Sequence, residues 1–368
     1  MDATVTITQL QTRKNDLNQM RLATVKQLLP LNNGEVLLKI SRAALTANNI
    51  TYAAFGDAMQ YWDFFPTGDE GWGQMPVWGF ADVVASNISE VAIGERFYGY
   101  FPLASHVTVQ PVRVSSRGFV DSSEHRSHLA SVYNQYVRCS QDPAYRQADE
   151  SYQAVVRPLY VTSFVCADFL QDNQFFGARQ VVISSASSKT AYGLAFCLRD
   201  QHRVSVSGLT SKQHQSFVEH LDCYQQVVSY EQLASIAADV PTVYVDFSGN
   251  EELRAAVHQH FGAALLYDCQ VGAAQNVRSP RDTALPGPAP KLFFAPSQIE
   301  KRLSEWGPQV FGQRSNEAQL RFIQRVSDAS DPWMRLVEHD GLASAQSLLS
   351  DMLAGRTVPG DAHVVLLD

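Results

Sequence analysis

The chain has 368 residues, of which 45 % are hydrophobic and 18 % charged, and its formal net charge is −8. This length predicts about two domains with a core that needs no disulfide or metal to hold it. The composition argues against intrinsic disorder, and the acidic balance against a nucleic-acid partner. No basic start leads into an apolar run, and no apolar stretch approaches the ~20 residues that cross a bilayer. We therefore expect a cytoplasmic protein with no membrane partner.

Residues 1–115 predict a domain of short strands. Asn33-Gly34 marks a turn, and runs with strand character recur at 35–40, 83–85, 96–100 and 106–109. Many short strands separated by turn residues are typical of a barrel or a sandwich. The following segment, 116–157, is polar and lacks strand alternation, so we expect a helical insertion or linker there.

Residues 158–332 have a different rhythm. Short apolar runs stand at 180–184, 203–207, 226–228, 242–246 and 263–267. Between the first two, Ala191, Leu194, Ala195 and Leu198 recur at helical spacing. Strands that alternate with helices of about ten residues predict βαβ units and a parallel sheet. A proline-rich stretch at 276–290 predicts a loop.

The first strand–helix junction of this region is a candidate phosphate site. A helix that starts directly after a strand presents unpaired backbone N–H groups and a positive dipole end, which suit a pyrophosphate. Small residues at three-residue spacing, Ser185, Ser188 and Ala191, stand where such loops normally carry glycines. A serine that merely caps the helix explains the same sequence. The expected phosphate-binding residues are Ser185, Ser187, Ser188, Lys189 and Thr190.

The end of the second strand of this region indicates which cofactor is expected. NAD-specific folds place an acidic residue there to hold the ribose hydroxyls. Here Ser207, Ser211 and Lys212 follow instead, which favours the 2′-phosphate of NADP(H). An ordinary polar helix start at Ser211 remains the alternative.

The cysteines argue against a structural zinc site. The five lie far apart, and the closest two, Cys197 and Cys223, are separated by 26 positions. Zinc ligands normally come in pairs two to four residues apart, so we expect no metal and no disulfide framework.

The ordered features resemble the medium-chain dehydrogenase/reductase superfamily, on its zinc-free quinone-oxidoreductase side. Ile93–Gly99, for example, is similar to the family's Val-Gly-Asp-Arg-Val-Tyr-Gly turn. The segments that carry the resemblance are, in order, 34–40, 43–49, 93–99, 104–109, 181–199, 243–249, 353–356 and 363–367. It implies a Rossmann-type doubly wound parallel sheet with a GroES-like β-barrel domain, formed by residues 1–115 and completed by residues 333–368.

The chain departs from the family pattern at two places. The loop glycines have become Ser185, Ser188 and Ala191, and Gly79-Phe80-Ala81 replaces the Gly-His-Glu of the zinc enzymes. A divergent branch is therefore expected, without catalytic zinc.

The resemblance also implies an activity. Zinc-free members pass a hydride from NADPH to an activated double bond of a small apolar carbonyl compound, such as an enone, a quinone or an enoyl thioester. It places Tyr52 near the nicotinamide as a donor of a hydrogen bond or a proton. Asn48 is expected to orient the nicotinamide or the substrate, and Thr162, Phe247 and Ser248 are expected beside the cofactor. A homodimer is expected by the same analogy.

The aromatic residues Tyr61, Trp62 and Trp78 lie in a glycine-rich loop, and we expect them to form a substrate-side wall. Packing against the barrel explains them equally well. Because the loop glycines are lost, the alternative function is a non-catalytic or altered-chemistry ligand-binding protein on the same scaffold.

Overall fold

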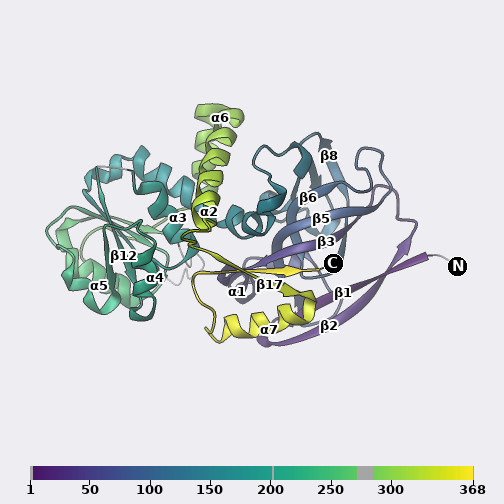
Figure 1. Cartoon of the computed structure of the whole chain (residues 1–368), viewed down its shortest axis with the longest axis horizontal. Coiled ribbons are helices and arrows are strands. Elements are labelled where there is room, and N and C mark those ends of the chain that lie inside the picture. The colour runs from purple at the N-terminus through teal and green to yellow at the C-terminus, as the bar shows by residue number, and fades with distance from the viewer. Residues whose placement is uncertain (1–2, 201–202, 272–284, 368) are drawn as a thin grey trace. The chain divides into compact units, whose positions relative to one another are not determined.

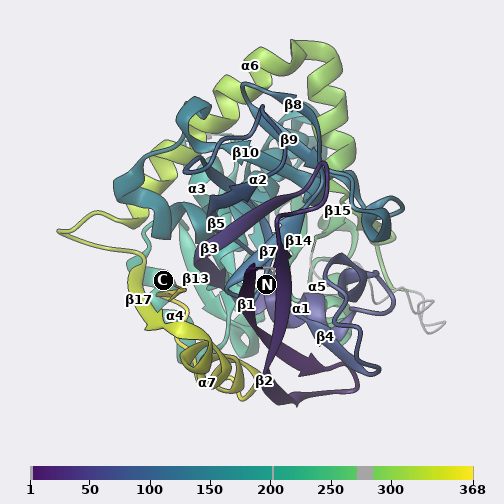
Figure 2. The same cartoon turned by 90° about the vertical axis from the view of Figure 1, so that its right-hand side faces the viewer.

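The computed structural model describes residues 3–200, 203–271 and 285–367 (Figures 1 and 2). The chain divides into two compact units. Unit 1 comprises the residues up to Val155 and those from Met334 onward, and unit 2 runs from Val156 to Trp333. The C-terminal segment therefore belongs with the N-terminal one.

Unit 1 is a mostly antiparallel β structure. Its strands are β1 (Ala3–Arg13), β2 (Asp16–Leu29), β3 (Val36–Leu45), β4 (Trp72–Gln74), β5 (Pro76–Ser86), β6 (Arg96–Pro102), β7 (His106–Val109), β8 (Pro111–Ser115), β9 (Gly118–Asp121), β10 (Gln135–Arg138), β17 (Arg335–Asp340) and β18 (Asp361–Leu366). Its helices are α1 (Ala47–Ala54) and α7 (Gly341–Leu353), with 3₁₀ turns η1 (Tyr61–Phe64), η2 (Glu124–Arg126), η3 (Ser131–Asn134), η4 (Cys139–Gln141) and η5 (Gln147–Asp149).

Two sheets build this unit. One has the order β2-β1-β4, and the other runs β17-β18-β3-β5-β6-β10-β9-β8 with β7 beside β3. α7 lies next to β2 (Figures 1 and 2), where Gln346 Nε2 donates to Met20 O over 3.3 Å. Apolar side chains of β3, β5, β6 and α7 form the core, and the strands predicted from the sequence lie within β3, β5, β6 and β7.

The segment 116–157 is not the helical insertion that its polar sequence predicts. It contains β9 and β10, β10 pairs with β6, and the residues up to Val155 belong to unit 1. Some of its polar side chains are buried and bind one another. Arg126, 1 % exposed, donates to Asp121 Oδ2 over 2.7 Å and to Tyr136 Oη over 3.2 Å. The polar sequence therefore contains a buried ion pair, and burial of the two charges is tolerated because the segment supplies both partners.

Unit 2 is an α/β structure. Its strands are β11 (Gln180–Ile183), β12 (Ser205–Thr210), β13 (Gln226–Ser229), β14 (Thr242–Asp246), β15 (Leu265–Gln270) and β16 (Lys291–Leu292). Its helices are α2 (Glu150–Asp172, which begins in unit 1), α3 (Lys189–Leu198), α4 (Gln215–His220), α5 (Glu251–Phe261) and α6 (Ala295–Val326), with 3₁₀ turns η6 (Gln174–Gly177), η7 (Lys212–His214), η8 (Tyr230–Ser235) and η9 (Gly262–Ala264).

The six strands of unit 2 form one parallel sheet in the order β13-β12-β11-β14-β15-β16. β11 and β14 are buried along their whole length, as expected for central parallel strands. The four apolar residues that predict α3 are all buried. The predicted fold class is therefore confirmed: a Rossmann-type parallel sheet with a mostly antiparallel β unit.

Two further observations bear on the sequence expectations. The loop predicted at 276–290 lies outside the described residues as far as 284, and 285–290 has no helix or strand. In the part of the chain that the structure describes, no helix is both long and apolar enough to span a membrane.

Candidate functional site

The turn between β11 and α3 contains the predicted phosphate-binding residues. Ser185 has a φ of 49°, in the left-handed region that favours glycine. Ser188 is the N-cap of α3, and its Oγ accepts from Ala191 N over 3.3 Å, as the alternative interpretation predicts. Ser187 Oγ lies 3.3 Å from His214 Nδ1. The backbone at Ser185 thus adopts a conformation suited to a glycine loop, while two serine side chains have partners within the protein.

α3 begins directly after this turn, so its positive end lies at the carboxyl edge of the sheet. Lys189 and Thr190 are the first residues of the helix and are half-buried. Thr190 O accepts a 2.7 Å hydrogen bond from Ser163 Oγ on α2. This bond fixes α2 beside the start of α3, and Thr162, predicted to lie near the cofactor, precedes Ser163 and is half-buried.

β12 ends later than the sequence predicts. Ser207 lies inside the strand opposite Val182 and is 2 % exposed, so it does not stand at the strand end. Thr210 stands there instead, and its buried Oγ1 has no hydrogen-bond partner among the described residues. Ser211 and Lys212 follow directly, the first half-buried and the second exposed.

The residues at this edge fit a dinucleotide. Ligands of such sheets bind outside the carboxyl ends of the strands where the strand order reverses, here between β11 and β14. The orphaned hydroxyl of Thr210, the left-handed backbone of Ser185 and the lysine at the start of α3 match a ribose and its phosphates. Burial lowers the pKa of His214. Thr210 was not predicted as a site residue, because the predicted strand ends at Ser207 and β12 continues to Thr210.

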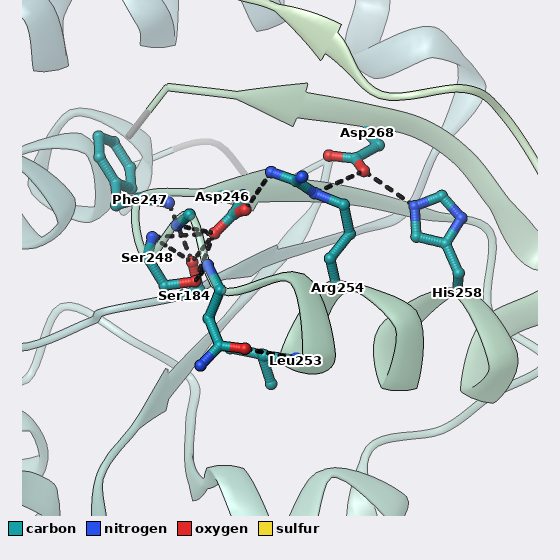
Figure 3. A network of polar contacts seen from close by, with 10 residues as sticks. Ser184, Asp246, Phe247, Ser248, Leu253, Arg254, His258 and Asp268 are labelled. Carbon is teal, nitrogen blue, oxygen red and sulfur yellow. Dashed lines mark hydrogen bonds and ion pairs between the residues drawn. The ribbon is translucent and has the colours of Figure 1, made fainter. Parts of the chain in front are cut away.

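A buried network ties the turn after β11 to the turn after β14 (Figure 3). Asp246, the fully buried last residue of β14, accepts at Oδ1 from the hydroxyls of Ser184 and Ser248, each over 2.7 Å. Ser184 Oγ in turn accepts from the backbone N–H of Phe247 over 2.9 Å. Phe247 and Ser248, predicted to contact the cofactor, are therefore held by their backbone beside β11.

Arg254 and His258, both from α5, extend this network (Figure 3). Arg254 Nη2 lies 2.5 Å from Asp246 Oδ2, and its Nε 3.4 Å from Asp268 Oδ2. His258 Nε2 lies 2.8 Å from that same oxygen, and its Nδ1 lies 2.8 Å from Pro286 O. Both ring nitrogens of His258 therefore lie beside oxygen atoms that accept hydrogen bonds.

In unit 1, Tyr52 and Asn48 lie one turn apart on α1. Asn48 Nδ2 donates to Tyr52 Oη over 2.7 Å, so the phenol oxygen accepts and its own proton can be donated elsewhere. Burial, followed by the phenol of Tyr61, raises the pKa of Tyr52, and Trp78 and Tyr133 act in the opposite direction. Tyr52 is therefore a protonated phenol at neutral pH.

The predicted substrate wall divides into two kinds of residue. Trp62 is 2 % exposed and lies in the core of unit 1. A Cβ on Gly56 or Gly73 would lie only 2.1 or 2.4 Å from its ring, so the two glycines enclose the indole. Trp62 is thus a packing residue, as the alternative interpretation has it. The contact could not be predicted from the sequence, because one glycine precedes Trp62 and the other follows it at a distance along the chain.

Tyr61 and Trp78 instead lie in an aromatic group with Tyr52. The Tyr52 and Tyr61 ring centroids are 4.5 Å apart, and Trp78 lies 4.9 Å from Tyr100. Tyr133, from the segment expected to be an insertion, joins them, and its hydroxyl lies 3.2 Å from that of Tyr61. We call Tyr52, Tyr61, Tyr100 and Tyr133 the tyrosine cluster. Tyr133 was missed because its partner is distant in the sequence.

The described residues contain no group of three or more His, Cys, Asp or Glu side chains arranged to hold a metal ion. Their free cysteines are Cys139, Cys166, Cys197, Cys223 and Cys269, and all but Cys197 are fully buried.

Solved structures match the whole chain at low sequence identity. CurA from Vibrio vulnificus, solved in complex with NADPH, has a TM-score of 0.58 and 14 % identity, covering 100 % of this chain and 99 % of that one. The quinone oxidoreductase from Coxiella burnetii has a TM-score of 0.53 and 15 % identity, with 98 % and 99 % coverage. A mutant of Etr1p, in complex with NADP and crotonyl-CoA, has a TM-score of 0.55 and 10 % identity, with 99 % and 100 % coverage.

These matches show the medium-chain dehydrogenase/reductase fold. No curated protein matches the chain by sequence. One family model does match, over residues 43–358, and its description is "Protein of unknown function (DUF2855)". Since the match covers most of the sequence, the chain belongs to the DUF2855 family, on a medium-chain dehydrogenase/reductase scaffold.

Proposed function

We propose that the protein is an NADPH-dependent, zinc-independent reductase of an activated carbon–carbon double bond. The observation that carries the proposal is the hydrogen bond of 2.7 Å from half-buried Asn48 to buried Tyr52, which presents a protonated phenol whose oxygen is already an acceptor. The fold is shared with structures that hold NADPH, or NADP with crotonyl-CoA.

Unit 2 supplies the cofactor residues in this proposal. Ser185, Lys189 and the positive end of α3 hold the pyrophosphate, and Thr210 the ribose. The exposed Lys212 and the half-buried Ser211 take the 2′-phosphate, where an NAD enzyme carries an acid. NADPH, when bound, supplies the hydride.

Unit 1 supplies the acid. When the β-carbon of an enone, quinone or enoyl thioester is reduced, negative charge develops on the carbonyl oxygen. Tyr52 donates a hydrogen bond and then its proton to that oxygen, and Asn48 keeps the phenol oriented. Tyr61 and Trp78 offer aromatic surface to a small apolar substrate.

Titration with the two reduced cofactors tests the proposal. NADPH is expected to bind more tightly than NADH and to raise the melting temperature further, since binding to the folded state alone stabilises it. Lys212→Ala is expected to weaken NADPH binding and to leave NADH binding unchanged. Equal binding of both would overturn the NADP assignment. A panel of enones, quinones and enoyl thioesters then tests the reaction, and turnover of none of them would contradict it.

A non-catalytic ligand-binding protein on the same scaffold is the second candidate. It is favoured by Ser188, whose side chain caps α3 where a loop glycine would leave the helix end open to a phosphate. Absence of binding of either cofactor in the same titration would support it. Saturable NADPH binding with turnover would exclude it.

A further inference from the structure

The helix that carries Tyr52 is short and depends on contacts with the rest of unit 1. α1 has eight residues, whereas isolated helices shorter than ~12–15 residues are marginal in water. Asn48 and Tyr52 lie on one face of this helix, joined by their hydrogen bond of 2.7 Å. The direction in which the phenol points therefore depends on what holds the first turn of α1 in place.

Asn49, the residue after Asn48, bonds to two elements at once. It is 3 % exposed, and its Oδ1 accepts from the backbone N–H of Thr46, the N-cap of α1, over 2.7 Å. Its Nδ2 donates to the carbonyl oxygen of Pro76, the first residue of β5, over 2.9 Å. The buried carboxamide thus links the start of the helix to the start of the strand.

The strand register explains why a link is needed at this point. β3 and β5 pair antiparallel, and the pair nearest to α1 is Ala44 with Trp78. Two residues further along the ladder the partners would be Thr46 and Pro76, but at Thr46 the chain leaves β3 and begins α1. In a continued ladder the Thr46 N–H would donate to the Pro76 carbonyl. The carboxamide of Asn49 lies between these two groups instead, accepting from the first and donating to the second.

Asparagine suits this place by its chemistry and its length. A carboxamide has an acceptor oxygen and an N–H donor, as a peptide group has, whereas a carboxylate only accepts. Consecutive side chains leave a helix about 100° apart, so Asn48 reaches Tyr52 one turn further on while Asn49 reaches β5. One asparagine thus orients the phenol, and the other fixes the helix that carries both residues.

We propose that Asn49 is a positioning residue for the reduction: its carboxamide fixes α1 on β5 and so sets where the phenol of Tyr52 is presented. The inference rests on the proposed function. Trp78, two residues after Pro76 on the same face of β5, packs against the tyrosine cluster, so the link also sets the phenol relative to this wall of the site. A displacement of about 1 Å at a reacting group can cost about 100-fold in rate. Loss of the link should therefore lower kcat more than it weakens substrate binding.

Two variants of Asn49 break the link in different ways. Asn49→Asp keeps an acceptor for the Thr46 N–H, but it replaces the donor toward Pro76 by a second acceptor. Asn49→Ser is too short to reach both partners. Gln153→Glu is the matched control, because Gln153 is a fully buried carboxamide of unit 1 whose Nε2 donates to Ala144 O over 3.1 Å. It makes the same chemical change on another helix.

Steady-state kinetics over a range of pH provide the first test. Near neutral pH, Asn49→Asp and Asn49→Ser are expected to lower kcat about 10- to 100-fold with KM nearly unchanged. On acidification the carboxyl group introduced by Asn49→Asp takes up a proton and regains a donor beside its acceptor. Its kcat, relative to that of the wild type, should then rise toward the wild-type value, while Asn49→Ser shows no recovery and Gln153→Glu keeps wild-type kcat throughout. Wild-type kcat in Asn49→Ser, or no recovery in Asn49→Asp, would overturn the positioning role.

Spectroscopy of the ligand-free protein provides a second test that needs no turnover. With 3-fluorotyrosine at position 52, fluorine NMR reports the surroundings of that phenol alone. Asn49→Asp is expected to move the resonance at neutral pH and to return it on acidification, and Asn49→Ser, which buries no charge, to move it at every pH. Gln153→Glu should leave it in place. An unmoved resonance in both Asn49 variants would overturn the positioning role and leave the proposed function intact, whereas an inactive wild-type protein with these shifts present would contradict only the function.

Discussion

The tyrosine cluster of unit 1 and the Asp246 network of unit 2 both bury polar side chains, but they satisfy them differently. In the network, Asp246 Oδ1 accepts from Ser184, Ser248 and the backbone of Gly249, and Oδ2 pairs with Arg254. In the cluster, the hydroxyl of Tyr100 has no partner among the described residues.

This difference separates a structural role from a chemical one. A buried ionic network holds backbone in place and loses much stability when one charge is removed. A group of phenols contains no fixed charge, so deleting one hydroxyl changes proton transfer more than stability. Unit 2 thus holds two turns rigid at its carboxyl edge, and unit 1 carries groups that can release protons.

The largest expected effect follows from breaking the network. Asp246→Ala leaves Arg254 buried without its closest counter-ion, so the free energy of unfolding should fall by about 3–5 kcal/mol. Urea unfolding measures it. Asp351→Ala is the control, because its pair with Arg356 lies at the surface, and it should change stability little. Equal losses in both variants would remove the contrast between buried and exposed pairs.

The next effect tests the other half of the comparison. Tyr52→Phe should reduce turnover about 100-fold, because general-acid groups contribute at least that much. Its free energy of unfolding should change by no more than about 1 kcal/mol, the usual value of one hydrogen bond. Steady-state kinetics and urea unfolding measure the two quantities on the same sample. A large loss of stability with turnover preserved would assign Tyr52 to packing.

The parallel sheet could be predicted because its signals are local. β11 and β14 are unbroken apolar runs, and α3 shows its buried face in four residues at helical spacing. Tyr52 and Asn48 were each predicted as site residues, and they lie one helical turn apart. Such features need no knowledge of distant contacts.

The features that were missed depend on distant partners. Arg126 and Asp121 are polar in the sequence and are buried because they meet each other and Tyr136. Trp62 is packed between two glycines, and Tyr133 lies beside Tyr61 although six strands separate the two residues in the sequence. Residue type alone does not indicate which partner tertiary structure will supply.

A pH effect of intermediate size is expected in unit 1, which also has an ionic group. Burial would raise the pKa of Glu150, but hydrogen bonds from Arg96 and Tyr145 lower it below its ordinary value. A carboxyl whose folded pKa is depressed contributes stability above its unfolded value, and loses it as the pH falls through the folded one. Stability should therefore decline below about pH 4.3.

Glu150→Gln tests this expectation. The variant should be less stable at neutral pH and should show a flatter decline on acidification, measured by urea unfolding at a series of pH values. A decline as steep as that of the wild type would assign the acid sensitivity to other carboxyls.

The smallest effect concerns Ser185 in the β11–α3 turn. A residue with a side chain at φ 49° is strained by about 1 kcal/mol relative to glycine. Glycine, however, loses more backbone conformational entropy on folding, which offsets part of this gain. Ser185→Gly should therefore change stability by only about 0.5 kcal/mol, but it opens the turn to close approach of a phosphate and should tighten NADPH binding. Ser187→Gly, at a residue without a left-handed φ, should lower stability and serves as the control. If Ser185→Gly leaves NADPH affinity unchanged, the serine side chain does not obstruct the phosphate. The loss of the loop glycines would then no longer favour a non-catalytic protein.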